Sequence, residues 1–232
     1  LQNMRKLGLY NIDGLKINEK IDKTTGCYGR LAEKACGKNS PVGHWEMSGY
    51  IKNPGFTTYP NAFPEEMIEE FKQKTGLKGI LCNEVGSGTE ILKRFGEEHI
   101  KTGYPIVYTS ADSVFQIAAH EEIIPVEKLY EICKIARKML DNPKYNVGTV
   151  IARPFVDKNG VYTRTSNRKD FSVEPEDGNL LDVLNKNNIN VWAVGKINDI
   201  FCGKGINKAV HIDDNMDGAD KTLMFMNEMD KG

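Results

Sequence analysis

The spacing of apolar positions predicts a chain in which helices and strands alternate. Residues 105–108 form a short apolar, β-branched run typical of a buried strand, and residues 79–82 and 147–155 predict two more. Apolar residues at the i, i+3, i+4, i+7 spacing predict an amphipathic helix with one buried face. These residues are Leu129, Ile132, Cys133, Ala136 and Leu140. Further helices are expected from residue 64, from residue 91 and over 215–229, so the pattern indicates the α/β class.

The strand at 105–108 ends in small polar residues. Ser110, Asp112 and Ser113 follow it directly. Hydroxyls both donate and accept hydrogen bonds, and an ionised carboxylate accepts them, so this strand end is suited to binding a polyol such as a sugar. The alternative is that these residues only form a turn or a helix cap.

Three arginines in the second half of the chain are candidates for binding a phosphate group. Arg153, Arg164 and Arg168 carry guanidinium groups, which match the oxygens of a phosphate monoester with paired, charge-assisted hydrogen bonds. The alternative is that they pair on the surface with nearby carboxylates, which contributes little energy. The sequence leaves both interpretations open.

Composition narrows the class of protein. The 232 residues are 40% hydrophobic and 27% charged, with a net charge of −1, so we expect neither a nucleic-acid partner nor a membrane partner. No apolar run approaches the roughly 20 residues that cross a bilayer. The five cysteines are far apart and the first residues do not resemble a signal peptide, so a cytoplasmic protein with reduced thiols and without a zinc site is expected.

Residues 110–122 resemble the corresponding segment of the bacterial phosphopentomutases, a family within the alkaline phosphatase superfamily. Other segments that resemble this family, in the family's order, are 43–47, 59–66, 87–90, 150–155, 164–170 and 194–201. The resemblance implies a partial alkaline-phosphatase-like, doubly wound α/β core with an inserted α/β cap domain. Residues 1–55 and 173–232 would then be core pieces, and residues 56–172 would be the cap that covers the substrate.

The resemblance also implies a function. It predicts an isomerase that interconverts ribose or deoxyribose 1-phosphate and 5-phosphate through a phosphoenzyme, with Mn²⁺ held by ligands outside this chain. It identifies no metal ligand within the chain. The residues implied to border the pentose phosphate, together with the three arginines, are Ser110, Asp112, Val114, Ile151, Arg153, Arg164 and Arg168.

The chain departs from the family pattern at two positions. Val42 stands where the resemblance implies the threonine that carries the phosphate, and Thr149 replaces an arginine. Ser40 is an alternative source of the carrier hydroxyl. A catalytically silent, sugar-phosphate-binding relative is therefore a second hypothesis, and the 232-residue chain alone is expected to be inactive.

Overall fold

The computed structural model describes residues 2–17, 19–37 and 39–229, and it divides into two compact units, residues 1–34 and residues 35–232. The first unit contains the helix α1 (Gln2–Lys6) and the short 3-10 helix η1 (Leu9–Asn11). The Asn11 side chain donates to the Ile21 carbonyl oxygen at 2.7 Å and accepts from the Ile21 amide at 3.0 Å. This pair of bonds closes the loop that follows η1.

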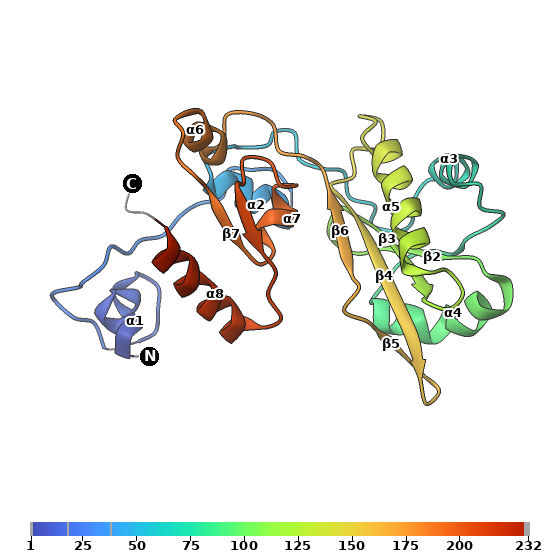
Figure 1. Cartoon of the computed structure of the whole chain (residues 1–232), viewed down its shortest axis with the longest axis horizontal. Coiled ribbons are helices and arrows are strands. Elements are labelled where there is room, and N and C mark those ends of the chain that lie inside the picture. Colours follow the sequence, from blue (N-terminus) through green and yellow to red (C-terminus); the bar gives the residue numbers. More distant parts are fainter. Residues whose placement is uncertain (1, 18, 38, 230–232) are drawn as a thin grey trace. The chain divides into compact units, whose positions relative to one another are not determined.

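The second unit contains a six-stranded mixed sheet (Figure 1). Its strands are β1 (Leu81–Val85), β2 (Ile106–Thr109), β3 (Val114–His120), β4 (Thr149–Lys158), β5 (Val161–Arg164) and β6 (Lys169–Ser172). The order is β1-β2-β3-β4, and β5 and β6 pair with different parts of β4. β1 pairs with β2 in parallel, as does β3 with β4, whereas the other pairs are antiparallel.

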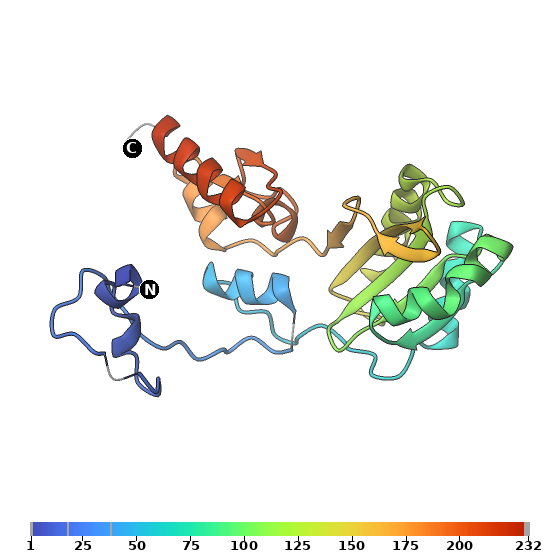
Figure 2. The same cartoon turned by 90° about the horizontal axis from the view of Figure 1, so that it is seen from below.

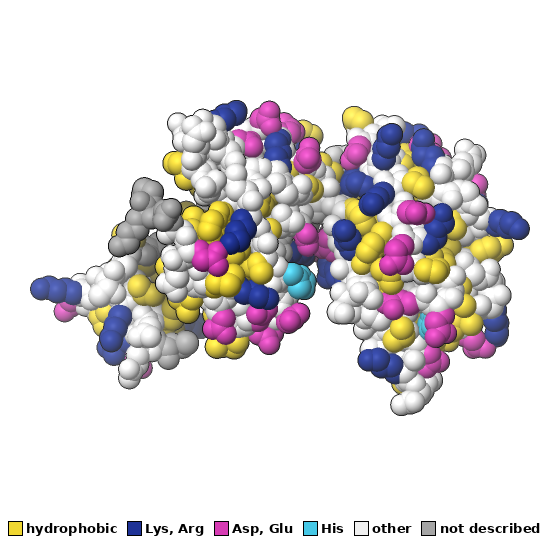
Figure 3. Space-filling model, in the orientation of Figure 1, with side chains coloured by type: hydrophobic (Ala, Val, Ile, Leu, Met, Phe, Trp, Pro, Cys, Tyr) yellow, Lys and Arg dark blue, Asp and Glu magenta, His cyan; other side chains and the backbone are white. Residues whose placement is uncertain are grey.

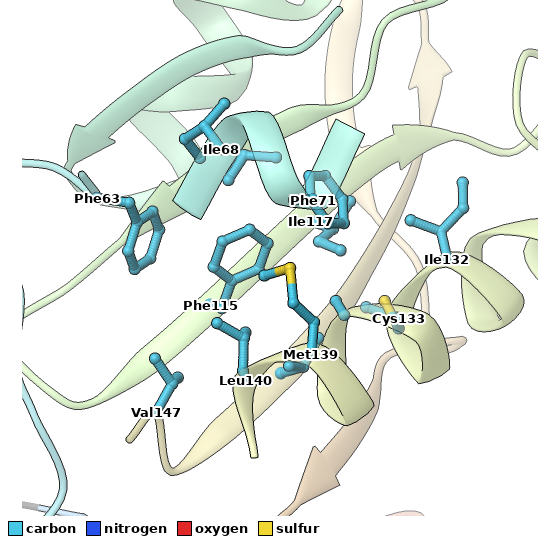
Figure 4. Packing of buried hydrophobic residues seen from close by; sticks show 14 of the residues in the cluster. Phe63, Ile68, Phe71, Phe115, Ile117, Ile132, Cys133, Met139, Leu140 and Val147 are labelled. Carbon is cyan, nitrogen blue, oxygen red and sulfur yellow. The ribbon is translucent and has the colours of Figure 1, made fainter. Parts of the chain in front are cut away.

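Helices cover both faces of this sheet because its strands are apolar on both sides. α3 (Glu65–Thr75) and α5 (Val126–Leu140) pack on one face, where Phe115 and Ile117 point into the larger core (Figure 4). α4 (Gly88–Thr102) packs on the other face against Tyr108 and Phe155. Successive residues of a strand point to opposite faces, so each strand supplies both cores.

The remaining elements of the second unit form a smaller cluster, which Figure 2 shows from below. They are α2 (Ser40–Met47), α6 (Leu180–Lys186), β7 (Trp192–Val194), α7 (Ile197–Ile200), β8 (Lys208–Val210) and α8 (Asn215–Glu228). β7 and β8 pair in parallel. Trp45 of α2 is 1% exposed, and its indole nitrogen donates to the Ile200 carbonyl oxygen at 3.3 Å, which ties α2 to the end of α7.

The structure confirms the α/β class, with the mixed sheet and helices of a partial alkaline-phosphatase-like α/β fold. The helix expected from residue 64 is α3, the helix with the five spaced apolar residues is α5, and the helix over 215–229 is α8. The helix expected from residue 91 is longer, since it begins at Gly88. In the part of the chain that is described, no helix has the length and hydropathy needed to cross a membrane.

Candidate functional site

One face of the sheet forms the floor of a pocket of about 260 Å³. Val114 and Gln116 of β3 lie opposite Thr149 and Ile151 of β4, and alternate residues share a face, so Arg153 follows on the same side. On β6, Ser172 and Asp170 lie opposite Thr149 and Ile151. All seven of these residues line the pocket.

The loop between β2 and β3 forms part of the rim of this pocket. Ser110 and Asp112 line the pocket. The Ser113 hydroxyl is buried beside them, where it donates to the Thr57 carbonyl oxygen and accepts from the Gly148 amide at 3.1 Å. Ser113 therefore holds the loop in place, and Ser110 and Asp112 are left facing the pocket.

The first residues of α2 form another side of the pocket. Asn39, Ser40 and Pro41 line it, and Asn39 caps the helix by accepting from the Val42 amide at 3.3 Å. The Ser40 residue is exposed and lies at the positive end of the helix dipole, which favours a negatively charged group there. The Val42 side chain is 2% exposed and packs in the cluster with Trp45 and Phe56, so position 42 presents no group to the pocket.

Charged side chains of both signs lie around the pocket. Arg168 donates two hydrogen bonds to the carboxylate of Asp170, at 2.8 and 2.9 Å, and Lys196 lies 3.1 Å from the same group. Burial works to raise the pKa of Asp170, but Arg168 and Lys196 outweigh it and hold this pKa below its ordinary value. Asp170 therefore stays ionised and holds both cations at the pocket.

Arg153 is the half-buried cation of the site. Its Nε donates to Gln116 Oε1 at 3.1 Å, which fixes the guanidinium above the sheet face. Burial lowers the pKa of Arg153, and the positive charges of Arg168 and Arg164 lower it further. Arg153 is therefore close enough to the other two guanidinium groups to be repelled by each of them.

The structure brings six of the seven predicted site residues together. Ser110, Asp112, Val114, Ile151, Arg153 and Arg168 line the pocket, whereas Arg164 does not. Arg164 lies beside Gly88 and the Tyr108 hydroxyl. The surface pairing considered for the arginines does occur for Arg168, whose partner is Asp170.

Several pocket residues were not predicted from the sequence. Gln116 and Asp170 share the sheet face with Val114 and Ile151, which follows only once β3 and β6 are known to be strands. Lys196 and Asp199 come from α7 and the residue before it. No local pattern marks these two, because only the fold brings them beside Asp170.

The described residues do not offer a site that fits a manganese ion. They contain no group of three or more His, Cys, Asp or Glu side chains placed to hold a metal. The Asp170 side chain is 10% exposed, and its carboxylate is already bound to two cations. On the face shown in Figure 3, acidic and basic side chains are interspersed.

Comparison with known proteins gives a consistent result. Proteins named phosphopentomutase from Clostridium novyi, Clostridium acetobutylicum and Acetivibrio thermocellus are 57%, 56% and 54% identical to this chain over 230, 232 and 228 residues. The alignments include 98–100% of this chain but only 58–59% of the relatives' length. No protein-family profile matches the chain.

Proposed function

We propose that this chain supplies the sugar-phosphate pocket of a phosphopentomutase, because it is 57% and 56% identical over nearly its whole length to two proteins of that name. The proposed reaction interconverts ribose or deoxyribose 1-phosphate and 5-phosphate through a phosphoenzyme. The chain spans less than two thirds of its relatives, so the proposal concerns the longer protein. We also propose a pentose phosphate as the partner molecule, Mn²⁺ bound by ligands outside this chain, and a cytoplasmic location.

One observation carries the proposal: the hydroxyl-bearing residue Ser40 lines the same pocket as Asp112 and Arg153. A serine hydroxyl can accept a phosphoryl group and return it to a different oxygen of the sugar, which splits one difficult transfer into two easier ones. The start of α2 favours the negative charge that such a group brings. Ser40 is therefore the proposed carrier, in place of the buried position 42.

The pocket residues have complementary roles in this proposal. Asp112 and Ser110 accept and donate hydrogen bonds to the sugar hydroxyls. Arg153 has no carboxylate partner within 4 Å among the described residues, so its charge is available to a phosphate. Arg168 and Lys196, held by Asp170, add positive charge at the same wall. Filling the pocket with sugar excludes water, which favours return of the phosphate over hydrolysis.

The experiment compares two variants of the full-length protein. Ser40→Ala removes the carrier hydroxyl, and we expect turnover of ribose 1-phosphate to fall by at least about a thousandfold, with no phosphoenzyme detected by mass spectrometry. Val42→Thr is the matched control. It places a hydroxyl in an apolar cluster, so we expect it to lower the free energy of unfolding by about 1–3 kcal/mol and to give no gain in turnover.

The second hypothesis, a catalytically silent sugar-phosphate-binding relative, predicts a different result. It rests on Val42 and on Thr149, whose hydroxyl lies in the pocket, 3.4 Å from that of Ser172. Under this hypothesis the unmodified full-length protein binds ribose 5-phosphate without turnover. Activity that appears only in Val42→Thr would support it, and activity retained in Ser40→Ala would exclude Ser40 as the carrier.

A further inference from the structure

The start of α4 lies beside the hydroxyl of a buried tyrosine. The Tyr108 side chain is 1% exposed, and its hydroxyl, which lies beside Gly88, takes part in none of the hydrogen bonds between described residues. A Cβ placed on Gly88, the first residue of α4, would lie 2.5 Å from this hydroxyl and would overlap the Arg164 guanidinium. The tyrosine hydroxyl and the guanidinium therefore both reach the backbone where α4 begins, and only glycine leaves room for them.

The first amides of α4 have no side-chain cap. Ser87 occupies the N-cap position, but its hydroxyl makes no capping hydrogen bond. The first backbone bond of the helix runs from the Ile91 amide to the Ser87 carbonyl oxygen at 2.9 Å, so the amides of Gly88, Thr89 and Glu90 precede it. These amides and the helix dipole form the positive end of a helix of 15 residues.

The arginines near the Tyr108 hydroxyl are not all paired with carboxylates. Arg153 and Arg164 form no ion pair in the part of the chain that is described, and Arg168 is paired with Asp170. The charges of all three guanidinium groups act on the Tyr108 hydroxyl, where they work against the rise in its pKa that burial causes. The unpaired Arg164 guanidinium lies beside a helix N-terminus, and a bound anion would relieve its repulsion with the helix dipole and with Arg153.

We propose that the start of α4, the Tyr108 hydroxyl and the Arg164 guanidinium form an oxyanion subsite that binds a phosphoryl group. The hydroxyl and the amides donate to the phosphoryl oxygens, and Arg164 supplies charge-assisted hydrogen bonds. Arg153 connects this subsite with the pocket, because it lines the pocket and also acts on Tyr108. That the phosphoryl group belongs to a sugar phosphate rests on the proposed function.

Binding of inorganic phosphate to the purified 232-residue chain tests the subsite. Isothermal titration calorimetry at pH 8 measures the dissociation constant for the wild type and three variants. We expect Arg164→Gln to weaken binding by at least about tenfold and Tyr108→Phe by roughly threefold or more, since each removes a donor. Arg94→Gln is the matched control: it removes a guanidinium from the same helix, but one that is paired with Glu84 at 2.8 Å, and should leave the constant unchanged.

Circular dichroism of each variant separates loss of binding from loss of fold. If Arg164→Gln and Arg94→Gln have the same affinity as the wild type, or if the folded wild type does not bind phosphate, the subsite is overturned. The same result follows if Tyr108→Phe, correctly folded, binds phosphate as tightly as the wild type. The Tyr108→Phe variant changes a single hydroxyl, so it serves as the second, conservative test.

A second titration with ribose 5-phosphate distinguishes this proposal from the proposed function. If phosphate binds in an Arg164-dependent manner and ribose 5-phosphate does not bind, the subsite stands and the sugar-phosphate function fails. If ribose 5-phosphate binding depends on Asp112, tested as Asp112→Ala, while neither ligand responds to Arg164→Gln, the function stands and the subsite is overturned.

Discussion

The buried imidazole of His99 connects α4 to the segment before β2 and to β3 through its two ring nitrogens. Its Nδ1 lies 2.7 Å from the Tyr104 carbonyl oxygen, and its Nε2 lies 2.9 Å from the His120 amide nitrogen. A carbonyl oxygen only accepts and an amide N–H only donates, so His99 carries its proton on Nδ1 and is neutral. A second proton on Nε2 would face the His120 N–H, and one of the two bonds would be lost.

This arrangement predicts a stability that depends on pH. Burial lowers the pKa of His99 below its ordinary value of 6.5, so the neutral form is favoured in the folded state. The resulting stability is present above pH 6.5 and is lost as the pH falls from there through the pKa of the folded state. We expect urea unfolding to show this decline in the wild type and a flatter dependence in His99→Gln, which also loses about 1–3 kcal/mol at pH 8.

The surface histidine provides the control for this measurement. His211 is exposed, and His211→Gln should keep the pH dependence of the wild type. An equally steep decline in His99→Gln would show that another group is responsible.

The positions of some site residues could be predicted from the sequence, and the positions of others could not. Ser110 and Asp112 follow a recognisable strand directly, so their place at the strand end could be predicted, and the structure puts both at the pocket. Lys196 is a single lysine in a short polar stretch, 26 residues beyond Asp170 in the chain. Its position beside that carboxylate depends on the path of the whole intervening segment, which no local pattern encodes.

At the scale of elements, periodicity predicted α5 correctly because one of its faces is buried and the other is exposed. Leu129 is 0% exposed in the larger core, whereas Ile135 on the same helix is 37% exposed. We expect Leu129→Ala to lower the free energy of unfolding by about 2–5 kcal/mol, since it removes buried methyl groups and leaves a cavity. Ile135→Ala, the matched control, should change it by less than about 1 kcal/mol in the same urea titration.

Equal losses for the two variants would mean that α5 does not pack as described.

The strand β3 was not predicted, and its burial explains why. Six of its seven residues are buried, so it lacks the apolar and polar alternation of a strand with one exposed face, and its two alanines are favourable in helices as well. Its identity as a strand comes from pairing with β2 and β4 on either side.

At the scale of the whole chain, the pocket is assembled from segments that are distant in sequence. The start of α2, the β2–β3 loop, β4, β6 and the residues around α7 each contribute. The described part of these segments contains no cluster of metal ligands. We therefore expect the purified 232-residue chain to show no turnover of ribose 1-phosphate in a coupled assay with added manganese. Turnover above the buffer rate, absent in Ser40→Ala, would contradict this expectation.

The parallel pair of β7 and β8 has a consequence for how the chain behaves in solution. Each of these strands pairs with only one described strand, so each leaves a row of backbone N–H and C=O groups without a partner strand in the described region. Parallel sheets are normally covered on both faces and extend over several strands. An open border of this kind is a template for adding another strand, from elsewhere in a longer polypeptide or from a second molecule at high concentration.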